Sequence, residues 1–135
     1  MTGRGGMTPE AVVVRYYRAL EAGDMDTLRS VMAPESYSMT LEAYGLKHTF
    51  SDPGFKVLLQ RAAGDVSARR KAEAVIAEAL RRDTRAVLLG DFRTETLGTA
   101  RCAVHYTENG FAKKMTLRET EAGWKIDYYA GRKCP

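Results

Sequence analysis

The sequence predicts an α+β protein in which N-terminal helices pack on a curved antiparallel sheet. Three observations predict it. Apolar residues recur at helical spacing in the first two thirds of the chain, the period changes to two after Arg85, and Asn109-Gly110 interrupts the alternating region. The 135 residues fit one domain, and a hydrophobic fraction of 44% is enough for a core. We expect a single domain over residues 8–130, between a flexible N-terminal segment, 1–7, and a C-terminal tail, 131–135.

The first two helices have clear boundaries. Thr8 can cap the first helix, and Pro9 suits its first position because the missing N–H has no helical partner there. Gly23 is placed to end it, since glycine most easily adopts the left-handed cap conformation. Asp24 can cap the second helix at once, and Pro34 ends it.

The segment over residues 36–64 is open to two interpretations. Apolar residues alternate with polar ones from Tyr37 to Ala43, which favours a strand, while composition also permits a short helix over Thr40–Tyr44. Turn residues follow at Ser51–Gly54, and a short helix is then expected to end near Gly64.

A longer helix is expected from a cap at Asp65 or Ser67 to about Asp83. Its predicted apolar stripe consists of Ala72, Val75, Ile76, Ala79 and Leu80.

Four strands are predicted after this helix. Asn109-Gly110 fixes the register of the central hairpin, because both residues tolerate the positive φ that a type I′ turn requires. Glu108 should therefore face Phe111, and a loop over Thr120–Gly123 should bring Leu117 opposite Ile126. Gly90 indicates a bulge. The expected strands are Arg85–Thr94, Thr99–Glu108, Phe111–Thr120 and Trp124–Ala130.

The register assigns every strand residue to one of two faces. The inner, apolar face collects Cys102, Val104, Tyr106, Met115, Leu117, Trp124, Ile126 and Tyr128. The outer, polar face collects Arg101, His105, Lys114, Thr116, Arg118, Lys125 and Asp127.

Two motifs carry a family resemblance. The chain opens with Pro9-Glu10-Ala-Val-Val-Val-Arg-Tyr16-Tyr17 and continues to Gly23-Asp24, and its last strand reads Gly123-Trp124-Lys125-Ile126-Asp127. Over roughly residues 8–130 it resembles the nuclear transport factor 2-like superfamily, which has the cystatin-like fold and includes ketosteroid isomerase and SnoaL-like cyclases. The resemblance is strongest to its bacterial lumazine-binding-like branch. It implies a cone with a pocket, and frequent homodimerisation through the sheet. Enzymes, binding proteins and scaffolds all use this fold, so the resemblance does not select a function.

The expected pocket is apolar and fringed by tyrosines. Tyr16 and Tyr17 on the first helix could place a phenol over it, or they could be core tyrosines whose hydroxyls are satisfied at the rim. The predicted ligand-binding residues are Tyr16, Tyr17, Tyr106, Met115, Trp124 and Tyr128, and the predicted ligand is small and apolar or aromatic.

Acid–base chemistry has few candidates. His48 and Asp52 could form a base and its orienting partner, with Tyr16 as a donor. Glu42 and Glu119 are weaker possible bases. Asp127 and His105 are placed on the outer face. Asp127 is expected to belong to a surface charge network, and His105 to lie at the surface or at a dimer interface.

The leading hypothesis is a small-molecule-binding domain. The alternatives are a cofactor-independent isomerase, cyclase or dehydratase, and a homodimeric protein-interaction module. No cofactor or metal site is expected, because the two cysteines and two histidines lack ligand spacing. A Cys102–Cys134 disulfide is less expected than a reduced chain.

Location and macromolecular partners follow from composition. The net charge of +4 comes from basic residues interleaved with acidic ones, which argues against nucleic-acid binding. No apolar run reaches the ~18–20 residues that a membrane span requires. The start of the sequence does not have the pattern of a signal peptide, so we expect a cytoplasmic protein unless a leader was removed.

Overall fold

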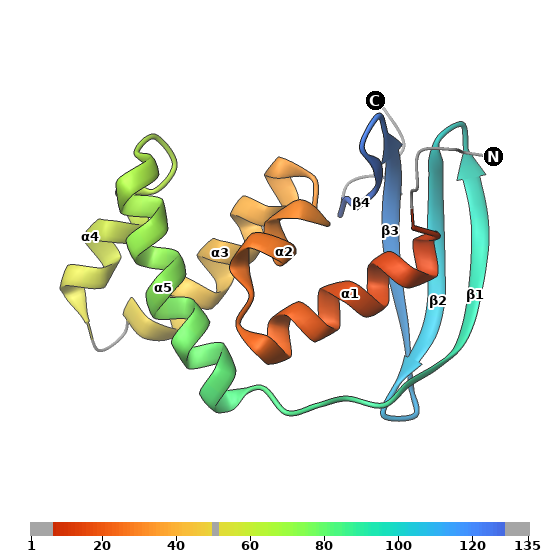
Figure 1. The fold of residues 1–135 in the computed structure, drawn as a ribbon, viewed down its shortest axis with the longest axis horizontal. Coiled ribbons are helices and arrows are strands. Elements are labelled where there is room, and N and C mark those ends of the chain that lie inside the picture. The colour runs from red at the N-terminus through yellow and green to blue at the C-terminus, as the bar shows by residue number, and fades with distance from the viewer. Residues whose placement is uncertain (1–6, 50–51, 129–135) are drawn as a thin grey trace.

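The helices come first in the chain and the sheet comes last (Figure 1). The structure, a computed structural model, describes residues 7–49 and 52–128, apart from the side chains at positions 48 and 49. The four strands form one antiparallel sheet in the order β1-β2-β3-β4. The sheet is curved, and α1 lies across its concave side (Figure 1), so the expected α+β fold class is confirmed. The elements are α1 (Pro9–Ala22), α2 (Met25–Ser30), α3 (Pro34–Thr49), α4 (Pro53–Arg61), α5 (Val66–Asp83), β1 (Leu89–Gly98), β2 (Arg101–Glu108), β3 (Phe111–Thr120) and β4 (Gly123–Ile126).

The predicted caps of α1 and α2 are confirmed. Thr8 Oγ1 accepts a hydrogen bond from Ala11 N at 3.2 Å, and Asp24 Oδ1 accepts one from Thr27 N at 3.1 Å. Gly23 ends α1 with φ 64°, in the left-handed region. A Cβ atom there would lie 2.5 Å from the Ala77 carbonyl oxygen of α5, so glycine is needed for conformation and for space.

The strand prediction over residues 37–43 is wrong, because this segment belongs to α3. Burial recurs at helical spacing, with Ser36, Tyr37, Thr40 and Leu41 buried while Met39 is 43% exposed. The buried Ser36 hydroxyl accepts a hydrogen bond from Tyr128 N at 2.9 Å. Polar residues thus occupy part of the buried face of the helix. The positions of the apolar residues alone therefore do not show which face is buried.

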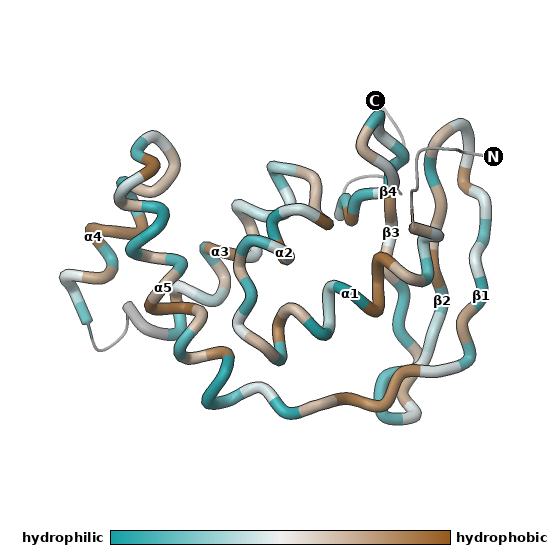
Figure 2. The backbone as a smooth tube through the Cα atoms, viewed as in Figure 1, coloured by the Kyte–Doolittle hydropathy of each residue, from teal (hydrophilic) through white to brown (hydrophobic). Residues whose placement is uncertain are grey.

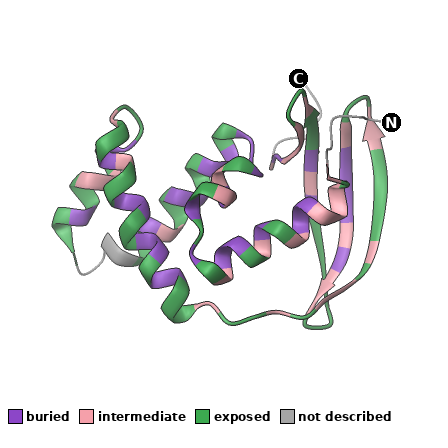
Figure 3. Ribbon diagram, viewed as in Figure 1, coloured by how far each residue is buried: buried purple, intermediate pink, exposed green. Residues whose placement is uncertain are grey.

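In α5 the predicted stripe is confirmed except at one position. Val75 is 42% exposed, and Glu73 is buried instead, with 4% of its surface accessible. Asp65 is the cap, accepting hydrogen bonds from Ser67 N and Ala68 N. Buried positions recur along α1 and α5 (Figure 3).

The hairpin register is confirmed at every pair of β2 and β3, from Glu108 opposite Phe111 to Arg101 opposite Arg118. Asn109 has φ 51° and Gly110 has φ 86°, as the predicted turn requires. Leu117 faces Ile126, as expected. The pairing shifts between Gly90 and Arg93, where the bulge was predicted.

Strand ends differ from the prediction at both edges of the sheet. The first strand begins at Leu89 rather than Arg85 and runs to Gly98, because residues 84–88 cross from α5 to the sheet (Figure 1). The last strand ends at Ile126 rather than continuing to Ala130. Asp127 N still bonds to Thr116 O of β3 at 2.9 Å, Tyr128 N bonds to Ser36 on α3, and positions 129 and 130 lie outside the described residues.

The core lies between α1 and the inner sheet face. Val12, Val13 and Leu20 of α1 belong to one buried cluster with Val104 and Leu117 of the sheet. Hydrophobic segments recur along α1 and β2, with hydrophilic ones between them (Figure 2). The inner-face assignment is confirmed by burial, with Trp124 and Tyr128 only partly buried.

Within the described ranges, no helix has both the length and the apolar character that crossing a membrane requires.

Candidate functional site

Tyrosine side chains gather where α1 meets the sheet. A cavity of about 270 Å³ lies there, between α1, α3, the connection from α5 to β1, and strands β2 and β3. Its walls include three tyrosines, two carboxylates and one methionine: Tyr16, Tyr17, Tyr44, Glu21, Glu108 and Met115. We call it the tyrosine cavity.

One wall of the tyrosine cavity is a chain of hydrogen bonds. The Tyr17 hydroxyl donates to Glu108 Oε1 at 2.7 Å, and the hydroxyls of Tyr106 and Tyr17 lie 2.6 Å apart. A phenol has a single proton. Because Tyr17 gives its proton to the carboxylate, Tyr106 donates to Tyr17, and the chain runs from Tyr106 through Tyr17 to Glu108.

The aromatic rings of this wall support one another. The rings of Tyr16 and Tyr17 meet edge to face at 5.3 Å, and those of Tyr17 and Tyr106 at 5.8 Å. Phe92 of β1 stacks on Tyr106 at 5.8 Å. Such pairs add to the stability gained from burial alone. The hydroxyl groups are therefore held by rings that are themselves packed in place.

The phenols of this site stay neutral at neutral pH. Burial is the largest cause that raises the pKa of Tyr17, and its hydrogen bonds with Tyr106 and Glu108 raise that pKa further. Burial also raises the pKa of Tyr16, followed by the effect of the neighbouring Tyr128 phenol. The site thus offers neutral hydroxyl groups beside the Glu108 carboxylate.

The structure brings together part of the predicted ligand set. Tyr16, Tyr17 and Met115 line the tyrosine cavity. Tyr106 is not one of the described lining residues, but its hydroxyl is hydrogen-bonded to that of Tyr17. Tyr128 lies behind this layer, with its hydroxyl 3.1 Å from Thr40 Oγ1. Trp124 pairs with Glu119 in the sheet and is not among the described residues that line the cavity.

Glu108 is the functional residue that the sequence analysis missed. It lies at the end of β2, two residues after Tyr106, and therefore shares the inner face of the strand. The alternation that placed Cys102, Val104 and Tyr106 inside extends to Glu108. Charged residues at hairpin ends are usually solvated, so the sequence pattern alone does not place Glu108 in the wall of a cavity.

The other acid–base candidates lie elsewhere. Asp52 is exposed and caps α4, accepting a hydrogen bond from Phe55 N at 3.0 Å. The side chain of His48 lies outside the described residues, so its pairing with Asp52 stays a prediction. Glu42 and Glu119 are exposed, and neither lines the tyrosine cavity.

The outer-face assignments of Asp127 and His105 are confirmed, with one correction. Asp127 bonds Arg118 Nε at 3.0 Å across the sheet, as expected, but it is only 8% exposed and therefore not a surface charge. His105 Nε2 lies 2.8 Å from Glu95 Oε1, and this contact is the first cause that lowers the pKa of Glu95. Asp127 thus forms an ion pair with Arg118 of β3, and His105 is hydrogen-bonded to Glu95 of the neighbouring strand β1.

No protein-family model and no curated protein matches the chain. A comparison with solved structures finds a crystal structure of a "putative dehydratase from the NTF2-like family" from Streptomyces avermitilis. The TM-score is 0.47 and the sequence identity is 16%, over 87% of this chain and 86% of that one. A similarity of this TM-score and sequence identity assigns no activity to this chain.

Proposed function

We propose that this protein is a small-molecule-binding domain whose ligand occupies the tyrosine cavity. The hydrogen-bond chain from Tyr106 through Tyr17 to Glu108 carries the proposal, because it presents one charged acceptor beside a preformed space. Ligand sites typically combine apolar walls with a few fixed polar groups. Leu20 and Met115 supply apolar wall here.

The chemistry of the walls indicates the ligand. An ionised Glu108 only accepts hydrogen bonds, and one contact with Tyr17 leaves lone pairs for a second donor. The volume of about 270 Å³ lies just below the range of about 300–1,000 Å³ that is usual for drug-sized ligands. A compact aromatic compound with one O–H or N–H group fits these limits.

Two matched probes test the proposal. p-Cresol differs from toluene by a hydroxyl group, so a site that uses Glu108 should bind p-cresol more tightly. We expect Glu108→Ala to weaken p-cresol binding at least tenfold in titrations followed by NMR, and to leave toluene binding unchanged. Glu119→Ala is the matched control, because Glu119 is an exposed carboxylate of the same sheet outside the cavity. Equal p-cresol affinities of the Glu108→Ala variant and the parent protein would refute the proposal.

A proton-transfer enzyme is the second candidate, and one observation favours it. A carboxylate and a phenol lie within 2.7 Å of each other at the wall of one cavity. Glu108 can act as a base toward a carbon acid, and the Tyr17 hydroxyl, once it turns from Glu108 to the substrate, can donate to the oxygen that becomes negative. This arrangement suits a cofactor-independent isomerase, cyclase or dehydratase.

Hydrogen exchange into a ketone separates the two candidates. We expect an enzyme of this type to speed deuterium incorporation next to the carbonyl of cyclohexanone in heavy water, measured by NMR. Glu108→Gln should slow that exchange about a hundredfold, in line with the usual contribution of a general base. Exchange no faster than in buffer would eliminate the enzymatic candidate and leave the binding proposal standing.

A further inference from the structure

A second and larger cavity lies among the helices. It has a volume of about 740 Å³ and is bounded by residues of α2, α3, α4 and α5 and of the segments that join them. It shares no lining residue with the tyrosine cavity. Aliphatic side chains form much of its wall, among them Met32, Leu41, Leu46 and Leu59. We call it the helical cavity.

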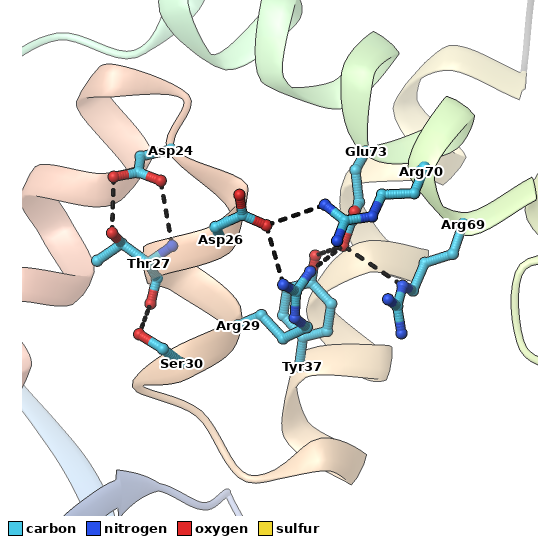
Figure 4. Close-up of polar contacts among 9 residues, drawn as sticks. All are labelled: Asp24, Asp26, Thr27, Arg29, Ser30, Tyr37, Arg69, Arg70 and Glu73. Carbon is cyan, nitrogen blue, oxygen red and sulfur yellow. Dashed lines mark hydrogen bonds and ion pairs between the residues drawn. The ribbon is translucent and has the colours of Figure 1, made fainter. Parts of the chain in front are cut away.

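Two arginines from different helices also line the helical cavity, Arg29 and Arg69 (Figure 4). Between them lies Glu73, which is buried and accepts hydrogen bonds from Tyr37 and from Arg29 Nη1, the latter at 3.2 Å. Arg69 Nε is 3.8 Å from Glu73 Oε2, which is an ion pair but too long for a hydrogen bond. Among the described residues, Arg69 Nε is a buried side-chain nitrogen without a hydrogen-bond partner.

The charges around Glu73 do not balance. A second carboxylate, Asp26, is exposed and shared between Arg29 Nη2 at 2.9 Å and Arg70 Nη1 at 3.2 Å (Figure 4). Three guanidinium groups thus meet two carboxylates, and each guanidinium carries five donors. Lys56 and Glu42, which also line the cavity, offset each other in charge. The arginine end keeps a positive charge and an unused donor.

We propose that the helical cavity binds a straight-chain carboxylate, with its head group at Arg69 and Arg29 and its chain along the aliphatic wall. The Arg69 side chain is partly exposed although its Nε is buried, so a carboxylate in the cavity would accept hydrogen bonds from its outer nitrogens. Guanidinium groups bind carboxylates with two-pronged geometry. Glu73, which itself accepts a hydrogen bond from Tyr37, holds Arg29 in position. A hydrocarbon chain suits walls made of leucine and methionine.

Calorimetry with decanoate and decanol tests the assignment, because the two probes share a chain length and differ in charge. We expect decanoate to bind at least tenfold more tightly than decanol. Arg69→Gln should remove that preference and leave decanol binding unchanged. The control is Arg82→Gln on the same helix, since Arg82 is exposed, pairs with Asp83 and does not line the cavity. It should keep the preference.

A second variant tests the location without changing a charge. Ala63 is exposed and lines the helical cavity, so Ala63→Trp should obstruct it and weaken both probes at least tenfold. p-Cresol binding at the tyrosine cavity should not change in either Arg69→Gln or Ala63→Trp. Equal affinities for decanoate and decanol in the parent protein, undiminished binding to Ala63→Trp, or an equal loss in Arg82→Gln would overturn the proposal.

Discussion

The Tyr17 hydroxyl donates to the Glu108 carboxylate at 2.7 Å, although 91 positions separate the two residues in the sequence. The contact joins the first helix to the end of β2, beside the turn that leads into β3. Removal of the Tyr17 hydroxyl in Tyr17→Phe deprives both Glu108 and Tyr106 of a partner. We expect the free energy of unfolding to fall by about 1 kcal/mol, measured in urea, because a part-buried hydrogen bond contributes about that much.

A double-mutant cycle checks that the three groups act as one chain. Tyr106→Phe alone should also destabilise the protein, and the double variant should lose less than the sum of the two single losses. Strictly additive losses would show that Tyr106 and Tyr17 are energetically independent, contrary to the chain described here.

Several tyrosines should resist alkaline ionisation. Burial is the first cause that raises the pKa values of Tyr16, Tyr17 and Tyr37 above the ordinary value of 10.0. A raised folded-state pKa means that the stabilising contribution is complete below pH 10.0 and is lost as the pH rises further. Phenolate absorbance from these three tyrosines should therefore appear only above pH 10.0, together with loss of native circular dichroism. Ionisation of these tyrosines near the ordinary pKa, with the fold intact, would contradict this expectation.

Glu73→Ala should be among the more damaging single changes. It leaves Arg29, Arg69 and the Tyr37 hydroxyl without their shared acceptor, and breaking a buried ion pair costs about 3 kcal/mol or more. Glu78→Ala is the matched control, because Glu78 is exposed on the same helix. Its effect should stay within about 0.5 kcal/mol. Urea unfolding of both variants measures the difference, and similar losses would refute the role given to Glu73.

Gly110→Ala should weaken the hairpin through backbone strain alone. Gly110 has φ 86°, and a Cβ atom there would meet nothing within 4 Å, so no clash contributes. Placing an alanine in the left-handed region costs about 1 kcal/mol. Gly64→Ala is the control, since Gly64 also has open space but no positive φ, and it should be nearly neutral. Thermal unfolding compares the two variants.

Local signals allowed much of the fold to be predicted. The caps at Thr8 and Asp24 and the turn at Asn109-Gly110 are properties of a few adjacent residues, so the sequence alone reveals them. The order that the residue pattern predicted, helices followed by four antiparallel strands, is also the order observed. The homodimer through the outer sheet face and the cytoplasmic location stay predictions.

Long-range contacts explain what the sequence did not reveal. The inner face of α3 includes Ser36 and Thr40, whose partner Tyr128 lies 92 and 88 positions away, so no local pattern identifies them as buried. Glu73 is buried for the same reason, because Tyr37 and Arg29 come from other helices. Glu108 joins the tyrosine cavity only when the first helix packs on the sheet.

Helix α3 has a consequence for any attempt to redesign this protein. It contributes Tyr44 to the tyrosine cavity, and Leu41 and Leu46 to the helical cavity. A protein interior is densely packed, so a substitution that rotates or shifts one helix displaces all its neighbours. The shape of one cavity therefore cannot be changed through α3 without altering the other. Independent tuning requires changes in α1 or β2 for the first cavity, and in α4 or α5 for the second.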